Sequence, residues 1–202
     1  MKTSHPSTDV RHHILETAQR LMGQRGFTAV GLSELLKAAD VPKGSFYHYF
    51  ESKEVFGEAL LENYFAIYQE NLNAMLAPGK GSAAERLMSY WSLWSETQAS
   101  HDPDGKCLAV KLGAEVCDLS DAMRSALQRG MQGIIGRLAR AIGEGQADGS
   151  LMAAEKPDAL AETLYFLWLG ASLMAKVSHD RMPMIRALAT TRRLLGISGP
   201  DA

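Results

Sequence analysis

The stretch that decides the fold runs from residue 41 to residue 50 and reads VPKGSFYHYF. Pro42 suits the opening of a helix, because the first N–H groups of a helix have no intrahelical acceptor. Phe46 and Phe50 are four residues apart, so they share one face of that helix and are expected to be buried. The other positions carry one lysine, two tyrosines and one histidine, and no acidic residue. The stretch predicts a short helix, residues 43–50, whose outer faces favour an anionic partner.

Further helices are predicted on both sides of this segment. Apolar residues recur with a helical period over residues 10–22, and Gly26 is expected to end that first helix. A short second helix is predicted over residues 32–39, and Ser52 is expected to cap a fourth helix that ends before Pro78. Two short helices that cross at a tight turn behind a longer one form a helix-turn-helix, whose second helix enters the major groove of DNA.

Residues 41–50, together with the Ser-Lys-Glu run at 52–54, resemble the signature of TetR-type transcriptional regulators. The resemblance implies an all-α fold of about nine helices. It implies a helix-turn-helix DNA-binding domain over residues 1–50 and a helical sensor and dimerisation domain over residues 51–202. It also implies a homodimer that pairs through its last two helices and binds a palindromic operator, with recognition helices about 34–36 Å apart.

Two positions depart from the common pattern of that family. Gly31 stands where a serine or threonine usually caps the second helix, which weakens the cap by a few tenths of a kcal/mol. Asp40 stands where glycine is usual, and the turn survives because aspartate tolerates the left-handed conformation.

The predicted DNA contacts fall into two kinds. Lysines are expected to contact phosphates, and polar side chains are expected to read bases beside a glycine that lets the backbone approach the DNA. The predicted contacts are Ser33, Lys43, Gly44, Ser45, Tyr47, His48, Tyr49 and Lys53.

Composition excludes several other classes of protein. The chain has 202 residues, of which 46% are hydrophobic and 22% charged, as in an ordinary globular protein. The net charge of −2 gives no support to a DNA partner, so that case depends on local patterning. The uncharged stretch at 163–175 is shorter than the roughly 20 residues that span a bilayer, and no membrane partner is expected. Two cysteines make no disulfide framework, which favours the cytoplasm, and no cofactor is indicated.

The two cysteines are the candidate signal sensors. Cys107 is expected in the first turn of a helix over about 105–117, where the helix dipole and neighbouring Lys106 would stabilise a thiolate. Cys117 is expected to be a small buried hydrophobic residue. Because ten residues of a continuous helix would separate them by about 15 Å, a disulfide between them is excluded unless the helix unfolds.

Residues 105–120 and 167–176 resemble the corresponding stretches of a group within the TetR family. Repressors of that group respond to reactive electrophiles and oxidants through the cysteine that matches Cys107, and they control enzymes that detoxify such compounds. The resemblance implies that this chain leaves its operator when Cys107 is modified. Lys176, which closes an apolar helix, is a second sensor candidate: it could lower the pKa of Cys107 or bond to the oxidised sulfur, although lysines in such places usually reach out to solvent.

Two alternatives stay open at this point. In the first, the same fold responds to a non-covalent apolar ligand, held in a pocket among Tyr90, Trp91, Trp94, Met123 and Trp168. In the second, Cys107 is the nucleophile of a thiol enzyme. No second cysteine, histidine or acid has a recognisable role beside it, and no metal-ligand spacing is present, so we expect that the chain is not an enzyme.

Overall fold

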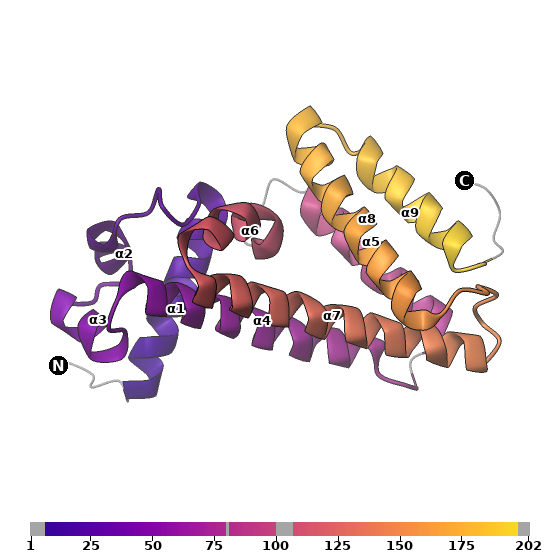
Figure 1. Cartoon of the computed structure of the whole chain (residues 1–202), viewed down its shortest axis with the longest axis horizontal. Helices are drawn as coiled ribbons and strands as arrows, with labels where there is room; N and C mark the ends of the chain where they lie inside the picture. Colours follow the sequence, from indigo (N-terminus) through magenta and orange to yellow (C-terminus); the bar gives the residue numbers. More distant parts are fainter. Residues whose placement is uncertain (1–6, 80, 100–106, 198–202) are drawn as a thin grey trace. The chain divides into compact units, whose positions relative to one another are not determined.

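The computed structural model describes residues 7–79, 81–99 and 107–197, and every regular element in these ranges is an α-helix. This confirms the all-α prediction and its number of helices (Figure 1). The nine helices of the described residues are α1 (Ser7–Arg25), α2 (Leu32–Ala38), α3 (Lys43–Tyr49), α4 (Lys53–Leu76), α5 (Ala83–Ala99), α6 (Leu108–Leu119), α7 (Asp121–Ala147), α8 (Pro157–Ser178) and α9 (Met182–Leu194).

Packing divides the chain into two compact units. The N-terminal unit comprises the described parts of Met1–Ala66 and Lys106–Gly130, and the C-terminal unit those of Ile67–Gly105 and Met131–Ala202. The long helices α4 and α7 each contribute one part to either unit. Helix α6 therefore shares a unit with α1, α2 and α3, although more than fifty residues separate them in the sequence.

The helix-turn-helix has the predicted local structure. Gly26 ends α1 with φ of 99°, a left-handed conformation that glycine adopts without a steric cost. Gly31 caps α2 without a side-chain hydrogen bond, as its lack of a side chain requires. Asp40 takes the left-handed conformation, with φ of 51°, and Val41 N then donates to Leu36 O at 3.0 Å. The tight turn between α2 and α3 is thus made without glycine.

In the N-terminal unit, the first parts of α4 and α7 pack closely through glycines. A Cβ on Gly57 of α4 would overlap the sulfur of Met123 and the ring of Phe27. A Cβ on Gly130 of α7 would overlap the ring of Phe65. These glycines allow the two helices to approach closely around buried aromatic rings.

The C-terminal unit contains α5, α8 and α9 together with the last parts of α4 and α7, and α8 and α9 lie side by side (Figure 1). Trp91 of α5 stacks on Trp168 of α8, with ring centroids 4.8 Å apart and planes 14° apart. By length and composition α8 could cross a membrane, but its position against α5 and α9 is that of a core helix, and 44% of its most apolar window is buried inside the chain.

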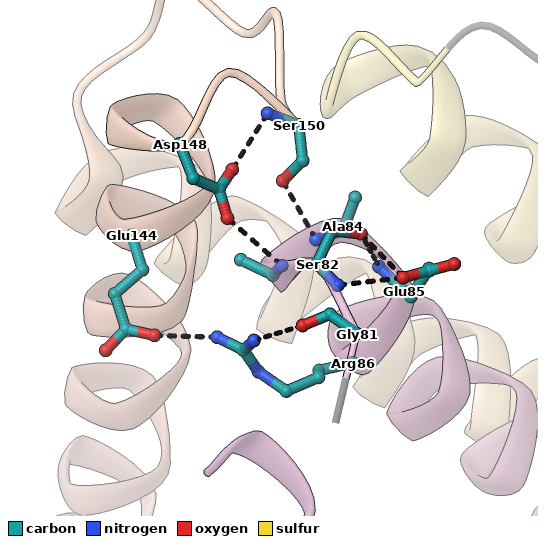
Figure 2. Close-up of polar contacts among 9 residues, drawn as sticks. Gly81, Ser82, Ala84, Glu85, Arg86, Glu144, Asp148 and Ser150 are labelled. Atoms are coloured by element: carbon teal, nitrogen blue, oxygen red, sulfur yellow. Dashed lines mark hydrogen bonds and ion pairs between the residues drawn. The ribbon is translucent and has the colours of Figure 1, made fainter. Parts of the chain in front are cut away.

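The start of α5 is held by the segment that follows α7 (Figure 2). Ala83 N donates to Asp148 Oδ2 at 3.4 Å, and Ala84 N donates to Ser150 Oγ at 3.2 Å. The buried Arg86 donates to Gly81 O and to Glu144 Oε2, both at 2.8 Å (Figure 2). The first N–H groups of a helix have no acceptor within the helix. In α5 they donate to a segment that is distant in the sequence.

Candidate nucleic-acid interface and sensor cysteine

Helix α3 is anchored by an aromatic cluster on its inner side. Phe46 is fully buried, and its ring centroid lies 5.2 Å from that of Phe50 and 5.3 Å from that of Phe56 at the start of α4. Ser52 supports the start of α4, since its Oγ accepts a hydrogen bond from Val55 N at 3.2 Å. The burial predicted for Phe46 and Phe50 is confirmed, although α3 ends at Tyr49 and Phe50 is its C-cap.

The outer faces of α3 carry most of the predicted DNA contacts. Tyr47 is 51% exposed, and the Nζ of Lys43 lies 6.0 Å from the centroid of its ring. A Cβ added to the exposed Gly44 would meet nothing within 4 Å, so the fold itself does not require glycine there. Of the other predicted contacts near these residues, Ser33 and His48 are exposed, and Ser45 and Tyr49 are half-buried.

Lys53 is engaged within the N-terminal unit. Its Nζ donates to Val30 O at 3.2 Å and lies 4.9 Å from the centroid of the Phe27 ring. The side chain is half-buried. These contacts tie the start of α4 to the loop between α1 and α2, and a phosphate contact by Lys53 stays a prediction.

Cys107 is the N-cap of α6, and the helix proper begins at Leu108, three residues later than predicted. Its side chain is 6% exposed, and its carbonyl oxygen accepts a hydrogen bond from Lys111 N at 3.2 Å. Leu108 N donates to the hydroxyl of the buried Tyr64 at 3.2 Å. The thiol therefore lies in the interior at the start of α6, beside a tyrosine of α4.

The acidity of Cys107 differs from the sequence expectation. Burial raises the pKa of the thiol above its ordinary value, and this effect outweighs the hydrogen bonds from Val110, Tyr64 and Ala109, which lower it. The predicted direction was wrong because it considered the start of the helix alone. Removal from water penalises the charged form of a cysteine, and sequence spacing does not reveal that removal. The expected charge at Lys106 lies outside the described residues.

Tyr64 is a site residue that sequence reasoning missed. It lies in the predicted fourth helix among other apolar and aromatic residues at helical spacing, which indicates only that it is buried. Its hydroxyl contacts the first N–H of α6 and lowers the pKa of Cys107. The sequence offers one signal, because a buried tyrosine hydroxyl usually has a hydrogen-bond partner. This rule does not identify the partner.

Two other sensor expectations have different outcomes. Cys117 is only half-buried, contrary to the prediction of a buried residue, because it lies near the end of α6 with Asp118 and Leu119 exposed beside it. Neither cysteine forms a disulfide within the described residues, and α6 is continuous between them. Lys176 is exposed in the last turn of α8 and belongs to the C-terminal unit, whereas Cys107 belongs to the N-terminal unit. A functional link between Lys176 and Cys107 stays a prediction.

The residues predicted to line a ligand pocket lie in two units. Tyr90, Trp91, Trp94 and Trp168 are buried together in the C-terminal unit, whereas Met123 belongs to the N-terminal unit. Trp94 Nε1 donates to Ser172 Oγ at 2.9 Å, and Trp168 Nε1 donates to Thr191 Oγ1 at 2.8 Å. Trp91 Nε1 is buried without a hydrogen-bond partner among the described residues. In the same ranges, no three His, Cys, Asp or Glu side chains gather as metal ligands.

The fold and the exposed face of α3 define a class of protein, the helix-turn-helix DNA-binding regulators. Residues 14–60 match the family described as bacterial regulatory proteins, tetR family. Residues 83–191 match the family described as tetracyclin repressor-like, C-terminal domain, which is more than half of the chain. The chain belongs to the TetR family of transcriptional regulators.

Individual relatives cover almost the whole chain. The HTH-type transcriptional repressor NemR of Escherichia coli K12 is 46% identical over 191 residues, which are 95% of this chain and 96% of the relative. The HTH-type transcriptional repressor DhaR of Mycobacterium sp. GP1 is 34% identical over 178 residues, 88% and 87% of the two chains. The crystal structure of reduced Escherichia coli NemR has a TM-score of 0.88 and 45% identity, and covers 96% of this chain and 100% of that one.

Proposed function

We propose that this TetR-type repressor binds a palindromic operator and releases it when a reactive electrophile or oxidant modifies Cys107. One observation carries the proposal: the thiol lies at the start of α6, in the same compact unit as the helix-turn-helix. A change at this sulfur therefore acts within the body that presents α3. The similarity to named repressors supports a role in transcriptional repression. We propose that the target genes encode detoxification enzymes.

The burial of Cys107 supports a steric mechanism of release. The side chain is 6% exposed and fills the interior beside Tyr64. An adduct on the sulfur adds atoms that a close-packed interior cannot accept without moving its neighbours. The start of α6, whose first N–H is bonded to Tyr64, is the neighbour that must move.

The covalent step needs no oxidant when the inducer is an unsaturated carbonyl compound. The thiol loses its proton to water, and the thiolate forms a bond from sulfur to the β-carbon. The electron pair of the carbon–carbon double bond moves to the α-carbon, which takes a proton from water. The raised pKa keeps most of the thiol protonated at neutral pH, so it should react with strong electrophiles and spare weak ones.

DNA binding by the outer faces of α3 is the other half of the proposal. The exposed Tyr47, His48 and Lys43 can reach into a groove, and the open space at Gly44 would let the DNA backbone approach closely. A dimer of such units fits a palindrome. The repressor would act in the cytoplasm, where the DNA is.

Exposed apolar residues on α8 and α9 support a homodimer formed through these helices. Phe166 is 56% exposed and Val177 is 66% exposed, with Leu173, Met174 and Ile185 also more than half exposed. Large apolar patches on a soluble chain mark interaction sites. Phe166→Glu should shift the protein to a monomer in light scattering. A dimer of unchanged stability would contradict this interface.

The test of sensing uses Cys107→Ser with Cys117→Ser as the matched control. A gel-shift titration on the DNA upstream of the chain's own coding sequence measures operator affinity with and without N-ethylmaleimide. We expect that Cys107→Ser binds the operator normally and keeps it after treatment, and that Cys117→Ser releases it like the wild type. Normal release by Cys107→Ser would refute the proposal. Mass spectrometry after treatment with a hypohalous acid tests whether Lys176 becomes crosslinked to Cys107.

A non-covalent inducer in the C-terminal unit is the second candidate. Trp91 supports it, because its buried Nε1 has no hydrogen-bond partner among the described residues and could donate to a ligand. Release of the operator from the Cys107→Ser/Cys117→Ser variant by a non-reactive aromatic compound would favour this candidate over sensing by Cys107.

A further inference from the structure

The loop between α1 and α2, residues 26–31, is held by the carboxylate of Glu115 on α6. Glu115 Oε2 accepts a hydrogen bond from Phe27 N at 2.9 Å, and Glu115 Oε1 accepts one from Thr28 N at 2.7 Å. The hydroxyl of Thr28 also donates to Oε1. One half-exposed carboxylate thus binds three donors from two consecutive residues.

The surroundings of this contact are shaped to accept the carboxylate. Gly26 has a positive φ, and a Cβ there would lie 3.1 Å from Glu115 Oε2, so a side chain at this position would crowd the contact. Lys111, one turn earlier on α6, adds an attractive charge. Partial burial raises the pKa of Glu115, but the hydrogen bonds from Thr28 and Phe27 and the charge of Lys111 outweigh it and hold the pKa below its usual range. The carboxylate is therefore ionised at neutral pH, as the three donors require.

Glu115 and Cys107 lie on the same rigid element. Cys107 caps α6, and Glu115 follows eight residues later in an unbroken helix, about 12 Å along its axis. A displacement of the start of α6 must therefore move Glu115 relative to the loop. The two N···O separations are 2.9 and 2.7 Å, and a shift of about 1 Å takes each of them beyond hydrogen-bond range.

The loop in turn positions the DNA-reading helices. It leads directly into α2, whose Leu36 carbonyl accepts the N–H of Val41 in the turn before α3. The other end of the loop is tied to α4, through the bond from Lys53 to Val30 O. The loop is thus held both by α4 and by the helix that the sensor cysteine caps.

We propose that Glu115 is the residue that transmits the state of Cys107 to the helix-turn-helix, because it holds the α1–α2 loop in the unmodified protein and releases it when α6 moves. This inference rests on the proposed function of Cys107. It assigns a positioning role to Glu115 and makes α6 a direct connection between the sulfur and the DNA-reading helices.

The first test measures amide hydrogen exchange at Phe27 and Thr28 before and after N-ethylmaleimide treatment, with Cys107→Ser as the control. We expect alkylation of Cys107 to raise exchange at these two amides about tenfold or more, and to leave it unchanged in Cys107→Ser. This measurement needs no DNA, so it tests the role of Glu115 even if alkylation does not release the operator. Unchanged exchange after complete alkylation would overturn the proposal.

The second test compares the loss of operator affinity on alkylation in Glu115→Gln and Thr28→Val with that in the wild type. The contact belongs to the unmodified state, so its removal should weaken operator binding by the unmodified protein. The loss of operator affinity on alkylation should then be smaller than in the wild type by a factor of about five or more. Thr28→Ser, which keeps the hydroxyl, and Asp118→Asn, which removes an exposed carboxylate from the same helix, should behave like the wild type. A full response in both Glu115→Gln and Thr28→Val would refute transmission through Glu115 but leave sensing by Cys107 intact.

If Glu115→Gln does not fold, Thr28→Val still tests the contact, because it removes one donor and leaves the helix unchanged. The absence of release in the alkylated wild type would instead refute the proposed function. The two failures are therefore distinguishable in one set of titrations.

Discussion

Replacing Tyr64 with phenylalanine removes one oxygen at the start of α6 and should change both stability and thiol reactivity. Leu108 N would lose its acceptor at 3.2 Å in a buried place. An unsatisfied buried N–H costs about 1–3 kcal/mol, and since 3.2 Å is at the long end of the range for such bonds, we expect a loss of about 1 kcal/mol in the free energy of unfolding. The hydroxyl also lowers the pKa of Cys107 against the effect of burial, so its removal raises that pKa further.

The effect on the rate of alkylation follows from the hydrogen bond between the same hydroxyl and the sulfur of Cys107. A hydrogen bond to a charged group contributes about 1.5–3 kcal/mol, and every 1.4 kcal/mol is about tenfold in an equilibrium. The smaller thiolate population slows the reaction, but the remaining thiolate is more basic and therefore a better nucleophile. This offsets about half of the effect on the logarithm of the rate. We therefore expect alkylation at neutral pH to slow by about three- to tenfold.

The assay is the pH dependence of the rate of reaction with N-ethylmaleimide, measured in the Cys117→Ser background so that one thiol reacts. Because the pKa of Cys107 is raised, the rate should still be increasing well above neutral pH in the parent, and the Tyr64→Phe midpoint should lie at higher pH. Tyr68→Phe is the matched control, since its hydroxyl forms a hydrogen bond with that of Tyr90 at 2.9 Å in the C-terminal unit. Equal rates and midpoints in Tyr64→Phe and the parent would refute a role for this hydroxyl.

Two further predictions concern DNA binding and packing. Lys43→Ala should weaken binding to all DNA sequences alike and reduce the slope of log affinity against log salt by about 1. Tyr47→Ala should instead weaken binding to the operator more than binding to unrelated DNA. A uniform loss of affinity in both variants would contradict base reading by Tyr47. Gly130→Ala should lower the free energy of unfolding by about 1–3 kcal/mol in urea titrations, because its Cβ would overlap the buried ring of Phe65. Gly136→Ala should not lower it, because a Cβ there meets nothing within 4 Å. Equal stabilities of the two variants would contradict the close packing of α4 on α7.

Features that depend on neighbouring residues could be predicted from the sequence. The spacing of Phe46 and Phe50 placed both in the core, and the departure at Asp40 led to a left-handed residue, as observed. Ser52 caps α4 as its type and position indicate. The reason is that periodicity, caps and turns are set by interactions within a few residues, which the sequence displays directly.

The sensor region was decided by contacts between residues far apart in the chain. The sequence indicates Cys107 and the helix after it, but the predicted direction of the pKa shift is wrong, because burial of the thiol outweighs the hydrogen bonds at the start of the helix. Glu115 reads in the sequence as an ordinary charge on a helix surface, and only the packing of α6 against α1 brings it to Phe27 and Thr28. Desolvation and hydrogen bonding both depend on which distant groups displace water around a side chain, and that information exists only once the helices have packed together.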